Sequence, residues 1–349
     1  MSTPLLQVEN LSVSFNTEDG VVKAVDGVSW SIEAGQSLGI VGESGSGKTV
    51  GGLTLLGLTR SGRTTVSGRA MFEGSDLVSM GDASLRAVRG KGIAMIFQDP
   101  LSSLHPFYRV GDQIIEAIQA HSQTPKKVAR ARAAELLALV GIPDPKARLD
   151  AYPHEFSGGM RQRAMIAMAL SNEPRLLIAD EPTTALDVTV QAQILELLDR
   201  LRRELQMALV IITHDLGVVA ETAEQVAVMY AGRIVEQSPV NELFSQPMHP
   251  YTWGLLRSIP KLTGPRDEAL LPIPGRPPSL ISRPKGCAFA ERCAYAEDAC
   301  RLTDPLLATT ADGRRSACLI PHERRMAAWP ALAAGGTEAD ALKVVRGTK

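Results

Sequence analysis

A glycine-rich stretch near the N-terminus directly follows a short apolar run. The run is Leu38–Val41, and the stretch is Gly42–Thr49, with the sequence Gly-Glu-Ser-Gly-Ser-Gly-Lys-Thr. Glycines let backbone N–H groups turn inward around phosphate oxygens, and a following helix adds a favourable dipole at its N-terminus. A surface turn carrying a lysine can also be rich in glycine, but here every fixed position of the phosphate-binding loop is filled. The stretch therefore predicts a phosphate-binding loop.

The residue types within this loop suit the parts of a nucleoside triphosphate. The Lys48 ammonium would reach the β- and γ-phosphates, and the Thr49 hydroxyl would coordinate Mg²⁺. Five further loop residues would surround the phosphates: Gly42, Ser44, Gly45, Ser46 and Gly47. We therefore predict a nucleotide site here.

Polar side chains stand at the ends of three later apolar runs. These side chains are Gln98, Asp180, Glu181 and His214. The runs alternate with segments of helical periodicity, which predicts a parallel sheet. Because ligands bind at the carboxyl ends of parallel strands, we expect these side chains to lie beside the phosphate-binding loop.

Each of these side chains has a chemical role that its type allows. Asp180 would hold Mg²⁺ opposite Thr49, through water, and Glu181 could polarise the attacking water as a general base. His214 could bond the γ-phosphate or hold the water, although a lone histidine is more often structural. The Gln98 amide oxygen could coordinate Mg²⁺. Paired acids can also form a solvated turn, but the phosphate-binding loop upstream argues against that.

Charge and hydropathy exclude several classes of protein. The chain has 349 residues and a formal net charge of -1, so it has no general basic field for nucleic acid. We see no signal peptide at the N-terminus. No apolar run approaches the roughly 18 residues that span a bilayer. We expect any membrane role to come through a partner.

The order of elements predicts an α/β fold with a P-loop NTPase (RecA-like) core. We expect an ATPase domain at residues 1–245, which begins with an antiparallel β subdomain and contains a helical insertion at about 101–165. Prolines crowd the chain beyond it, which predicts an irregular C-terminal extension over 246–330. Residues 331–349 read as a flexible tail.

All the cysteines of the chain fall in this extension. They are Cys287, Cys293, Cys300 and Cys318. Four thiolates can hold Zn²⁺ tetrahedrally or a [4Fe–4S] cluster. The rest of the chain reads as a cytosolic nucleotide enzyme, which disfavours two disulfides. The spacing lacks the paired C-x2-C of most structural zinc sites.

Taken together, these motifs resemble the ATPase subunit of an ATP-binding cassette (ABC) transporter. The set, in the family order, is the phosphate-binding loop, Gln98, Ser157-Gly158-Gly159, Asp180-Glu181, Ala185-Leu186-Asp187 and His214. The resemblance covers residues 5–240. It implies a head-to-tail pair of ATPase subunits, with ATP between the phosphate-binding loop of one and the Ser157–Gly159 signature of the other.

The resemblance also gives roles to residues outside the loop. Ser157 is a plausible N-cap, and backbone N–H groups of Gly158 and Gly159 would meet the γ-phosphate across the interface. Asp187 would signal between the two sites. Phe15 matches the adenine-stacking position, although it also reads as a core residue.

A finer resemblance is to the oligopeptide/dipeptide importer branch. Residues 98–106, 156–163, 249–252 and the segment from Leu271 to the cysteines carry it. It implies a second, homologous ATPase subunit, two integral membrane permeases and an extracytoplasmic solute-binding protein, with no nucleic-acid partner. The chain would lie peripherally on the cytoplasmic face of a bacterial inner membrane. In this branch an iron–sulfur cluster is expected, which favours [4Fe–4S] over Zn²⁺.

The branch implies that the loop after Gln98 and the helical insertion form a groove for a permease. Candidate contacts are Leu104, Phe107 and Tyr108, which equally suit the core of the insertion. The predicted function is ATP hydrolysis that powers import of peptides or related solutes. One alternative is a soluble ABC ATPase acting on a nucleic-acid, ribosomal or metabolic complex; another is an iron or redox sensor.

Overall fold

The computed structural model describes residues 3–99, 103–184, 186–259 and 272–347. The strands are β1 (Leu6–Thr17), β2 (Gly20–Ile32), β3 (Ser37–Val41), β4 (Thr64–Phe72), β5 (Ser75–Asp76), β6 (Ile93–Ile96), β7 (Leu176–Asp180), β8 (Ala208–Thr213), β9 (Gln225–Tyr230), β10 (Arg233–Pro239), β11 (Ala308–Thr309) and β12 (Arg315–Ser316). The helices are α1 (Lys48–Leu55), α2 (Asp82–Val88), α4 (Val110–Gln119), α5 (Lys126–Leu139), α6 (Pro145–Arg148), α7 (Gly158–Ala169), α8 (Val188–Leu205), α9 (Leu216–Thr222), α10 (Val240–Ser245), α11 (Pro250–Arg257), α12 (Asp298–Leu302), α13 (His322–Ala333) and α14 (Glu338–Arg346). Two short 3₁₀ turns are η1 (Pro153–Glu155) and η2 (Ala290–Arg292).

A mixed sheet forms the centre of the molecule, with strand order β11-β12-β10-β9-β3-β8-β7-β6. β9, β3, β8, β7 and β6 run parallel, as predicted. Every residue of β3, β7 and β8 is buried, which explains their uninterrupted apolar sequences. Val41 pairs with Thr213, and Asp180 with Ile212, so these strands end at one edge of the sheet.

The predicted antiparallel β subdomain covers one face of this sheet. Its strand order is β2-β1-β4-β5. Alternate residues of β1 are buried, as expected for a half-buried strand. One hydrophobic cluster joins Val13 of β1, Leu55 of α1 and Ile40 of β3, so α1 is packed between the two sheets.

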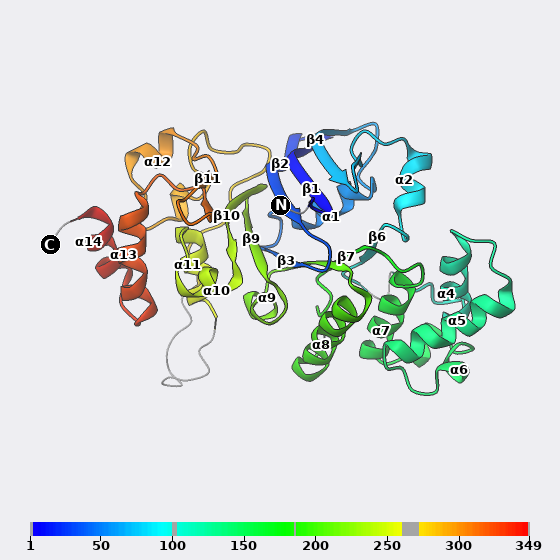
Figure 1. The fold of residues 1–349 in the computed structure, drawn as a ribbon. Coiled ribbons are helices and arrows are strands. Elements are labelled where there is room, and N and C mark those ends of the chain that lie inside the picture. Colours follow the sequence, from blue (N-terminus) through cyan, green and yellow to red (C-terminus); the bar gives the residue numbers. More distant parts are fainter. Residues whose placement is uncertain (1–2, 100–102, 185, 260–271, 348–349) are drawn as a thin grey trace.

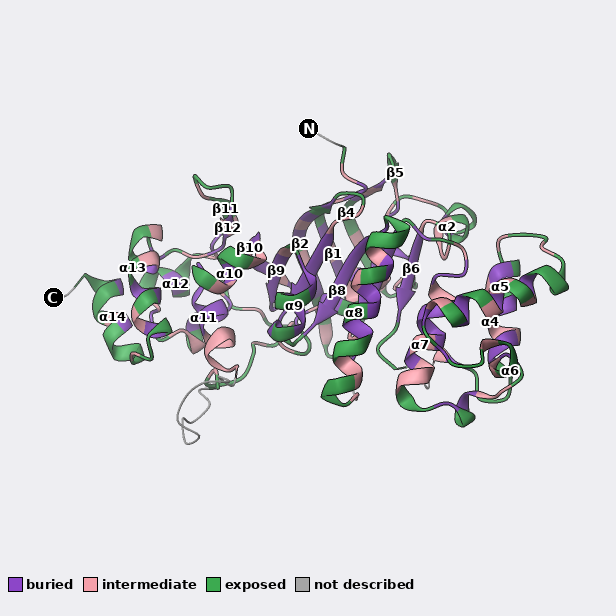
Figure 2. Ribbon diagram, turned by 60° about the horizontal axis from the view of Figure 1, so that its bottom comes forward, coloured by how far each residue is buried: buried purple, intermediate pink, exposed green. Residues whose placement is uncertain are grey.

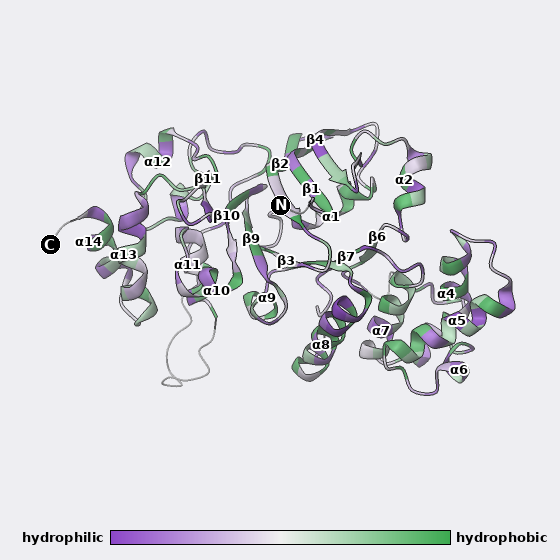
Figure 3. Ribbon diagram, in the orientation of Figure 1, coloured by the Kyte–Doolittle hydropathy of each residue, from purple (hydrophilic) through white to green (hydrophobic). Residues whose placement is uncertain are grey.

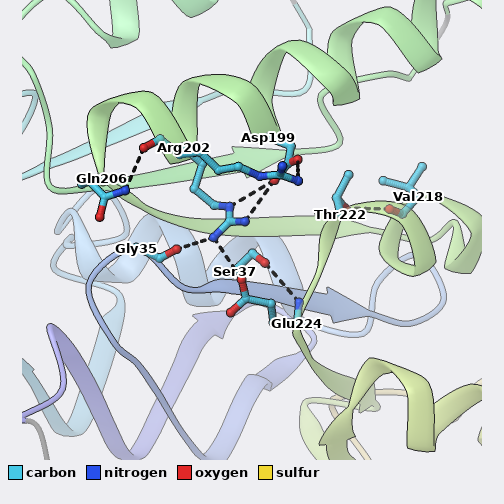
Figure 4. Close-up of polar contacts among 9 residues, drawn as sticks. Gly35, Ser37, Asp199, Arg202, Gln206, Val218, Thr222 and Glu224 are labelled. Carbon is cyan, nitrogen blue, oxygen red and sulfur yellow. Dashed lines mark hydrogen bonds and ion pairs between the residues drawn. The ribbon is translucent and has the colours of Figure 1, made fainter.

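The amphipathic helix α8 packs on the central sheet. The apolar residues in the middle of the helix, from Ile194 to Leu201, are buried, and its other side faces solvent (Figures 2 and 3). Arg202 near its C-terminus bonds the backbone oxygen of Gly35 and pairs with Glu224 at 3.0 Å (Figure 4). The backbone N–H of Glu224 in turn donates to the Ser37 hydroxyl, at 3.1 Å. The C-terminal end of α8 is thus joined to the starts of β3 and β9 by polar contacts as well as by hydrophobic packing.

The predicted helical insertion consists of α4, α5, α6 and α7, at one end of the molecule (Figure 1). Ile114, Ile115 and Ile118 are buried on one side of α4, as their spacing predicted. Leu104 is also buried and belongs to this core. Phe107 and Tyr108, by contrast, are 82% and 60% exposed, and their contact with a permease stays a prediction.

The C-terminal extension lies at the opposite end of the molecule (Figure 1). Its two short strands continue the central sheet, because β12 pairs with β10. The extension predicted as irregular over 246–330 is irregular over much of 272–297, but it also contains α11, α12, β11, β12 and most of α13. The tail predicted as flexible over 331–349 also contains regular structure. Residues 338–346 form α14, which Thr337 caps and whose Ala341 and Val345 pack into a cluster with Trp329 of α13. Among the described residues, no helix has the length and apolar character needed to cross a membrane.

Candidate functional site

The glycine-rich loop connects β3 to α1 at the common edge of the parallel strands. A Cβ at Gly42, whose φ is 156°, would lie 2.1 Å from the backbone oxygen of Met229, so only glycine fits there. Lys48 Nζ donates to the backbone oxygens of Gly42, at 2.7 Å, and Glu43, at 3.0 Å. Burial lowers the pKa of Lys48, opposed by nearby Glu181. The ammonium lies inside the loop.

Thr49 and Asp180 meet across the site. The Thr49 hydroxyl, in the first turn of α1, donates to Asp180 Oδ1, at 3.1 Å. Asp180 ends β7 and is 2% exposed. Burial raises its pKa to about 6, although the bond from Thr49 lowers it. A hydroxyl and a buried carboxylate that lie side by side are a donor set that suits a hard divalent cation.

Glu181 is the centre of a hydrogen-bond network. His214 Nδ1 lies 3.0 Å from Glu181 Oε1, and Gln98 Nε2 and the Thr184 hydroxyl donate to Oε2, each at 2.8 Å. Burial pulls the pKa of Glu181 upward, but the bonds from His214 and Thr184 outweigh it, so the net pKa is lowered. Its φ of 47° is left-handed, a strained conformation that clusters at functional sites.

The structure therefore brings together the side chains that the sequence placed at strand ends. These are Gln98, Asp180, Glu181 and His214, beside Lys48 and Thr49 of the loop. Sequence reasoning missed Thr184, for which the only signal was a hydroxyl three residues after Glu181. Phe15 is half-buried on β1 against the core, and its contact with adenine stays a prediction.

The Ser157–Gly159 signature forms the N-terminus of α7, away from α1 (Figure 1). The Ser157 hydroxyl caps the helix by accepting from the Met160 N–H, at 3.3 Å. A Cβ at Gly159 would lie 2.8 Å from Cγ1 of Val190 on α8, so the two helices approach closely there. Asp187 caps α8 by accepting from the Val190 N–H, at 3.0 Å.

Several residues that carried the resemblance lie outside the described part of the chain. They are Pro100, Leu101, Ser102, Ala185 and Leu271.

The prediction of a [4Fe–4S] cluster, with Zn²⁺ as its alternative, is wrong. Within the described residues, which include all four cysteines, no group of three or more His, Cys, Asp or Glu side chains is arranged to hold a metal ion. The cysteines are free. Burial raises the pKa of Cys287, and that of Cys318 to about 11.

Solved ATP-binding cassettes share this fold. A dimeric ATP-binding cassette bound to ADP and Pi aligns with a TM-score of 0.60 and 24% identity, covering 67% of this chain and 98% of that one. That likeness concerns the fold alone. The cbiO1 protein of Clostridium perfringens, part of an ABC transporter complex, aligns with a TM-score of 0.58 and 30% identity over 70% of this chain and 92% of its own. Fold and site together define an ABC-type ATPase.

Sequence comparisons identify the family. Residues 25–184 match the ABC transporter family, and residues 235–300 match the family described as "Oligopeptide/dipeptide transporter, C-terminal region". The oligopeptide transport ATP-binding protein OppD of Haemophilus influenzae is 50% identical over 92% of this chain and 98% of its own length. The dipeptide transport ATP-binding protein DppD of Escherichia coli is 50% identical over 91% and 97%. The chain belongs to the ABC transporter family and is one of its ATPases.

Proposed function

We propose that this chain is the ATP-hydrolysing subunit of an importer for oligopeptides, dipeptides or related solutes. The observation that carries the proposal is the network around Glu181, at the strand edge where the phosphate-binding loop begins. The similarity to OppD and DppD over nearly the whole chain supports peptides as the solute. We also propose an ATPase domain over 1–245, with the insertion at about 101–165, and an extension over 246–330.

In the proposed site, ATP binds with its phosphates in the loop Gly42–Thr49. Lys48 leaves the loop oxygens that it now bonds and reaches the β- and γ-phosphates. The donor set of Thr49 and Asp180 fits Mg²⁺. Gln98 joins it through its amide oxygen, because its Nε2 is engaged by Glu181. When bound, the cation neutralises charge on the phosphate oxygens.

Hydrolysis depends on how Glu181 is held. Its lowered pKa keeps the carboxylate ionised at neutral pH, so it can accept a hydrogen bond from a water molecule. His214 and Thr184 fix the two carboxylate oxygens, and therefore the direction in which the water is polarised. Glu181 takes the proton as the water oxygen forms a bond to the γ-phosphorus; the bond from that phosphorus to the β–γ bridging oxygen breaks, and ADP and phosphate are released.

A second ATPase subunit completes the site. The Ser157–Gly159 signature begins α7, apart from α1 of the same chain (Figure 1). We propose that backbone N–H groups of Gly158 and Gly159 meet the γ-phosphate on a homologous subunit, as in a head-to-tail dimer. Asp187, at the start of the nearby α8, would link the two sites.

The remaining partners are proposed to be two membrane permeases, fed by an extracytoplasmic solute-binding protein. The exposed Phe107 and Tyr108, near the start of the helical insertion, would contact a permease. The chain would then lie peripherally on the cytoplasmic face of the inner membrane.

Reconstitution tests this proposal. The full chain is combined with its genomically adjacent permeases and second ATPase in liposomes, and uptake of a radiolabelled tripeptide is measured with ATP supplied to the ATPase side. We expect uptake that requires ATP and is lost with Lys48→Ala. Stable assembly without any peptide uptake, whichever peptide length is offered, would contradict the peptide assignment. Copurification with ribosomes or nucleic acid instead of permeases would contradict the transport role.

A further inference from the structure

A residue of the C-terminal extension holds the phosphate-binding loop. Arg292, the last residue of η2, forms a two-pronged ion pair with Glu43: Nη1 lies 2.7 Å from Oε2 and Nη2 lies 2.9 Å from Oε1. Glu43 is the second residue of the loop Gly42–Thr49. The Arg292 side chain is 6% exposed and that of Glu43 is 26% exposed, so the pair is largely shielded from solvent. Such paired geometry is the strong, directional form of a charge-assisted hydrogen bond.

The surroundings of Arg292 leave it little freedom. Its Nε donates to the backbone oxygen of Pro274, at 2.8 Å, and Nη1 also reaches the Tyr230 hydroxyl, at 3.3 Å. The guanidinium carbon lies 5.7 Å from the centre of the Tyr230 ring and 5.9 Å from that of Phe289. These contacts come from the extension and from β9. The position of Arg292 therefore depends on how the extension packs against β9.

A second residue of the C-terminal extension also forms a hydrogen bond with Glu43. The Glu43 backbone N–H donates to the hydroxyl of Tyr251, on α11, at 2.8 Å. Tyr251 is fully buried and packs against Tyr230 and Phe289. Glu43 is thus held at its N–H by Tyr251, at its carboxylate by Arg292, and at its carbonyl by Lys48.

We propose that the C-terminal extension sets the position of the phosphate-binding loop through Arg292 and Tyr251, and thereby sets the affinity for ATP. The inference rests on the proposed ATP site at this loop. Both are positioning residues: they fix Glu43, whose carbonyl is a partner that Lys48 must release to reach a phosphate. A loop that is already held in place loses less conformational freedom when ATP binds. Removing the contacts that hold it should therefore weaken ATP binding.

A double-variant cycle on the full chain tests this inference. The variants are Arg292→Met, Glu43→Gln and their combination, and the measurement is calorimetric titration with ATP and Mg²⁺. We expect each single variant to raise the dissociation constant about tenfold. The combined variant should also raise the dissociation constant about tenfold and no more, because both changes remove the same ion pair. Arg292→Lys keeps the charge without the two-pronged geometry and should recover only part of the affinity.

Arg283→Met is the matched control. Arg283 also joins the extension to the cassette, and its side chain is 13% exposed. Its ion pairs are with Asp26, at 2.8 Å, and Asp304, at 3.6 Å, both outside the loop. We expect its ATP affinity to equal that of the wild type. In hydrolysis, Arg292→Met should raise KM more than it lowers kcat, a split that general destabilisation does not produce.

The role of the C-terminal extension and the ATP site itself are tested by different variants. Three results would each overturn the inference. The first is an unchanged ATP dissociation constant in Glu43→Gln, and the second is a hundredfold increase in the combined variant. The third is an increase in Arg283→Met equal to that in Arg292→Met. Lys48→Ala tests the site itself: if ATP still bound normally there, the proposed site would be wrong. Should Arg292→Met fail to fold, Glu43→Gln and Arg292→Lys carry the same test, because both keep the size and polarity of the position.

Discussion

His214 Nδ1 lies 3.0 Å from Oε1 of Glu181, where the carboxylate accepts the hydrogen bond. Glu181 follows β7 and His214 follows β8, which are neighbours in the central sheet. Parallel pairing thus brings together two side chains separated by 33 positions in sequence. The contact fixes one carboxylate oxygen and contributes to the lowered pKa of Glu181.

Replacing His214 should slow hydrolysis without weakening ATP binding. In His214→Ala, Glu181 loses a donor, so its pKa rises and its orientation is less fixed. We expect kcat to fall by about 10²-fold or more, with little change in the ATP dissociation constant. Steady-state phosphate release and calorimetry measure the two quantities. His154→Ala is the control, because its exposed ring stacks on Tyr152 outside the site. A His214→Ala enzyme with wild-type kcat would contradict the role.

Asp180 should make the nucleotide-free chain less stable above pH 6. Burial raises its pKa from 3.8 to about 6, so the unfolded chain loses this proton more readily than the folded chain. The stability that the protonated carboxyl contributes is fully present below pH 3.8 and is lost as the pH rises through about 6. Asp180→Asn should therefore unfold at a higher temperature than the wild type at pH 7.5.

The same variant separates stability from ligand binding. At pH 7.5, ATP with Mg²⁺ should raise the unfolding midpoint of the wild type far more than that of Asp180→Asn, because ligand that binds only the folded state stabilises it. Differential scanning calorimetry from about pH 3 to about pH 8, a range that brackets the pKa values of 3.8 and about 6, measures both effects. A lower midpoint for Asp180→Asn at pH 7.5 without ligand would refute the burial argument.

Gly159→Ala should destabilise the chain, although alanine normally favours a helix. The added Cβ would lie 2.8 Å from Cγ1 of Val190, closer than real contacts allow. We expect a loss of about 1–3 kcal/mol in urea unfolding, and reduced ATPase activity. Val190→Ala removes the obstructing methyl groups, so the combined variant should recover both. Recovery of stability without activity would show that the signature needs glycine for a reason other than this contact.

Metal chelation should leave the chain unaffected. The cysteines are free, and burial raises the pKa of Cys287 and of Cys318. Treatment with EDTA or an iron chelator should not change the unfolding midpoint measured without ATP. Anaerobically purified protein should show no visible absorption band, and Cys300→Ala should cost only what the loss of a small buried side chain costs. A visible band lost on chelation would contradict this account.

The sequence allowed prediction of those features that depend on local pattern. The apolar runs 38–41 and 176–179 predicted buried parallel strands, and their shared edge predicted that Asp180 would meet Thr49. Glycine positions and strand order are strong signals because few other structures satisfy them. The fold class and the core of the site were therefore accessible from sequence.

Contacts between distant segments were not accessible in this way. Tyr251 and Arg292 reach Glu43 from 208 and 249 positions away, and nothing near either residue indicates the phosphate-binding loop. The cysteine spacing suggested a metal site because spacing alone cannot show whether thiols converge in the required geometry. The segment 338–346 is short, and its helix depends on packing against Trp329.

The most direct test of the central claim is the Glu181→Gln variant in the reconstituted assembly. The amide keeps the size of the side chain and can still bond Thr184, but it cannot accept a proton. We predict that the variant binds ATP with wild-type affinity, hydrolyses it at less than about 1% of the wild-type rate, and supports no peptide uptake. Glu173→Gln, at a surface residue paired with Arg132, is the matched control and should leave both activities unchanged. Hydrolysis by Glu181→Gln at a rate near that of the wild type would contradict the account.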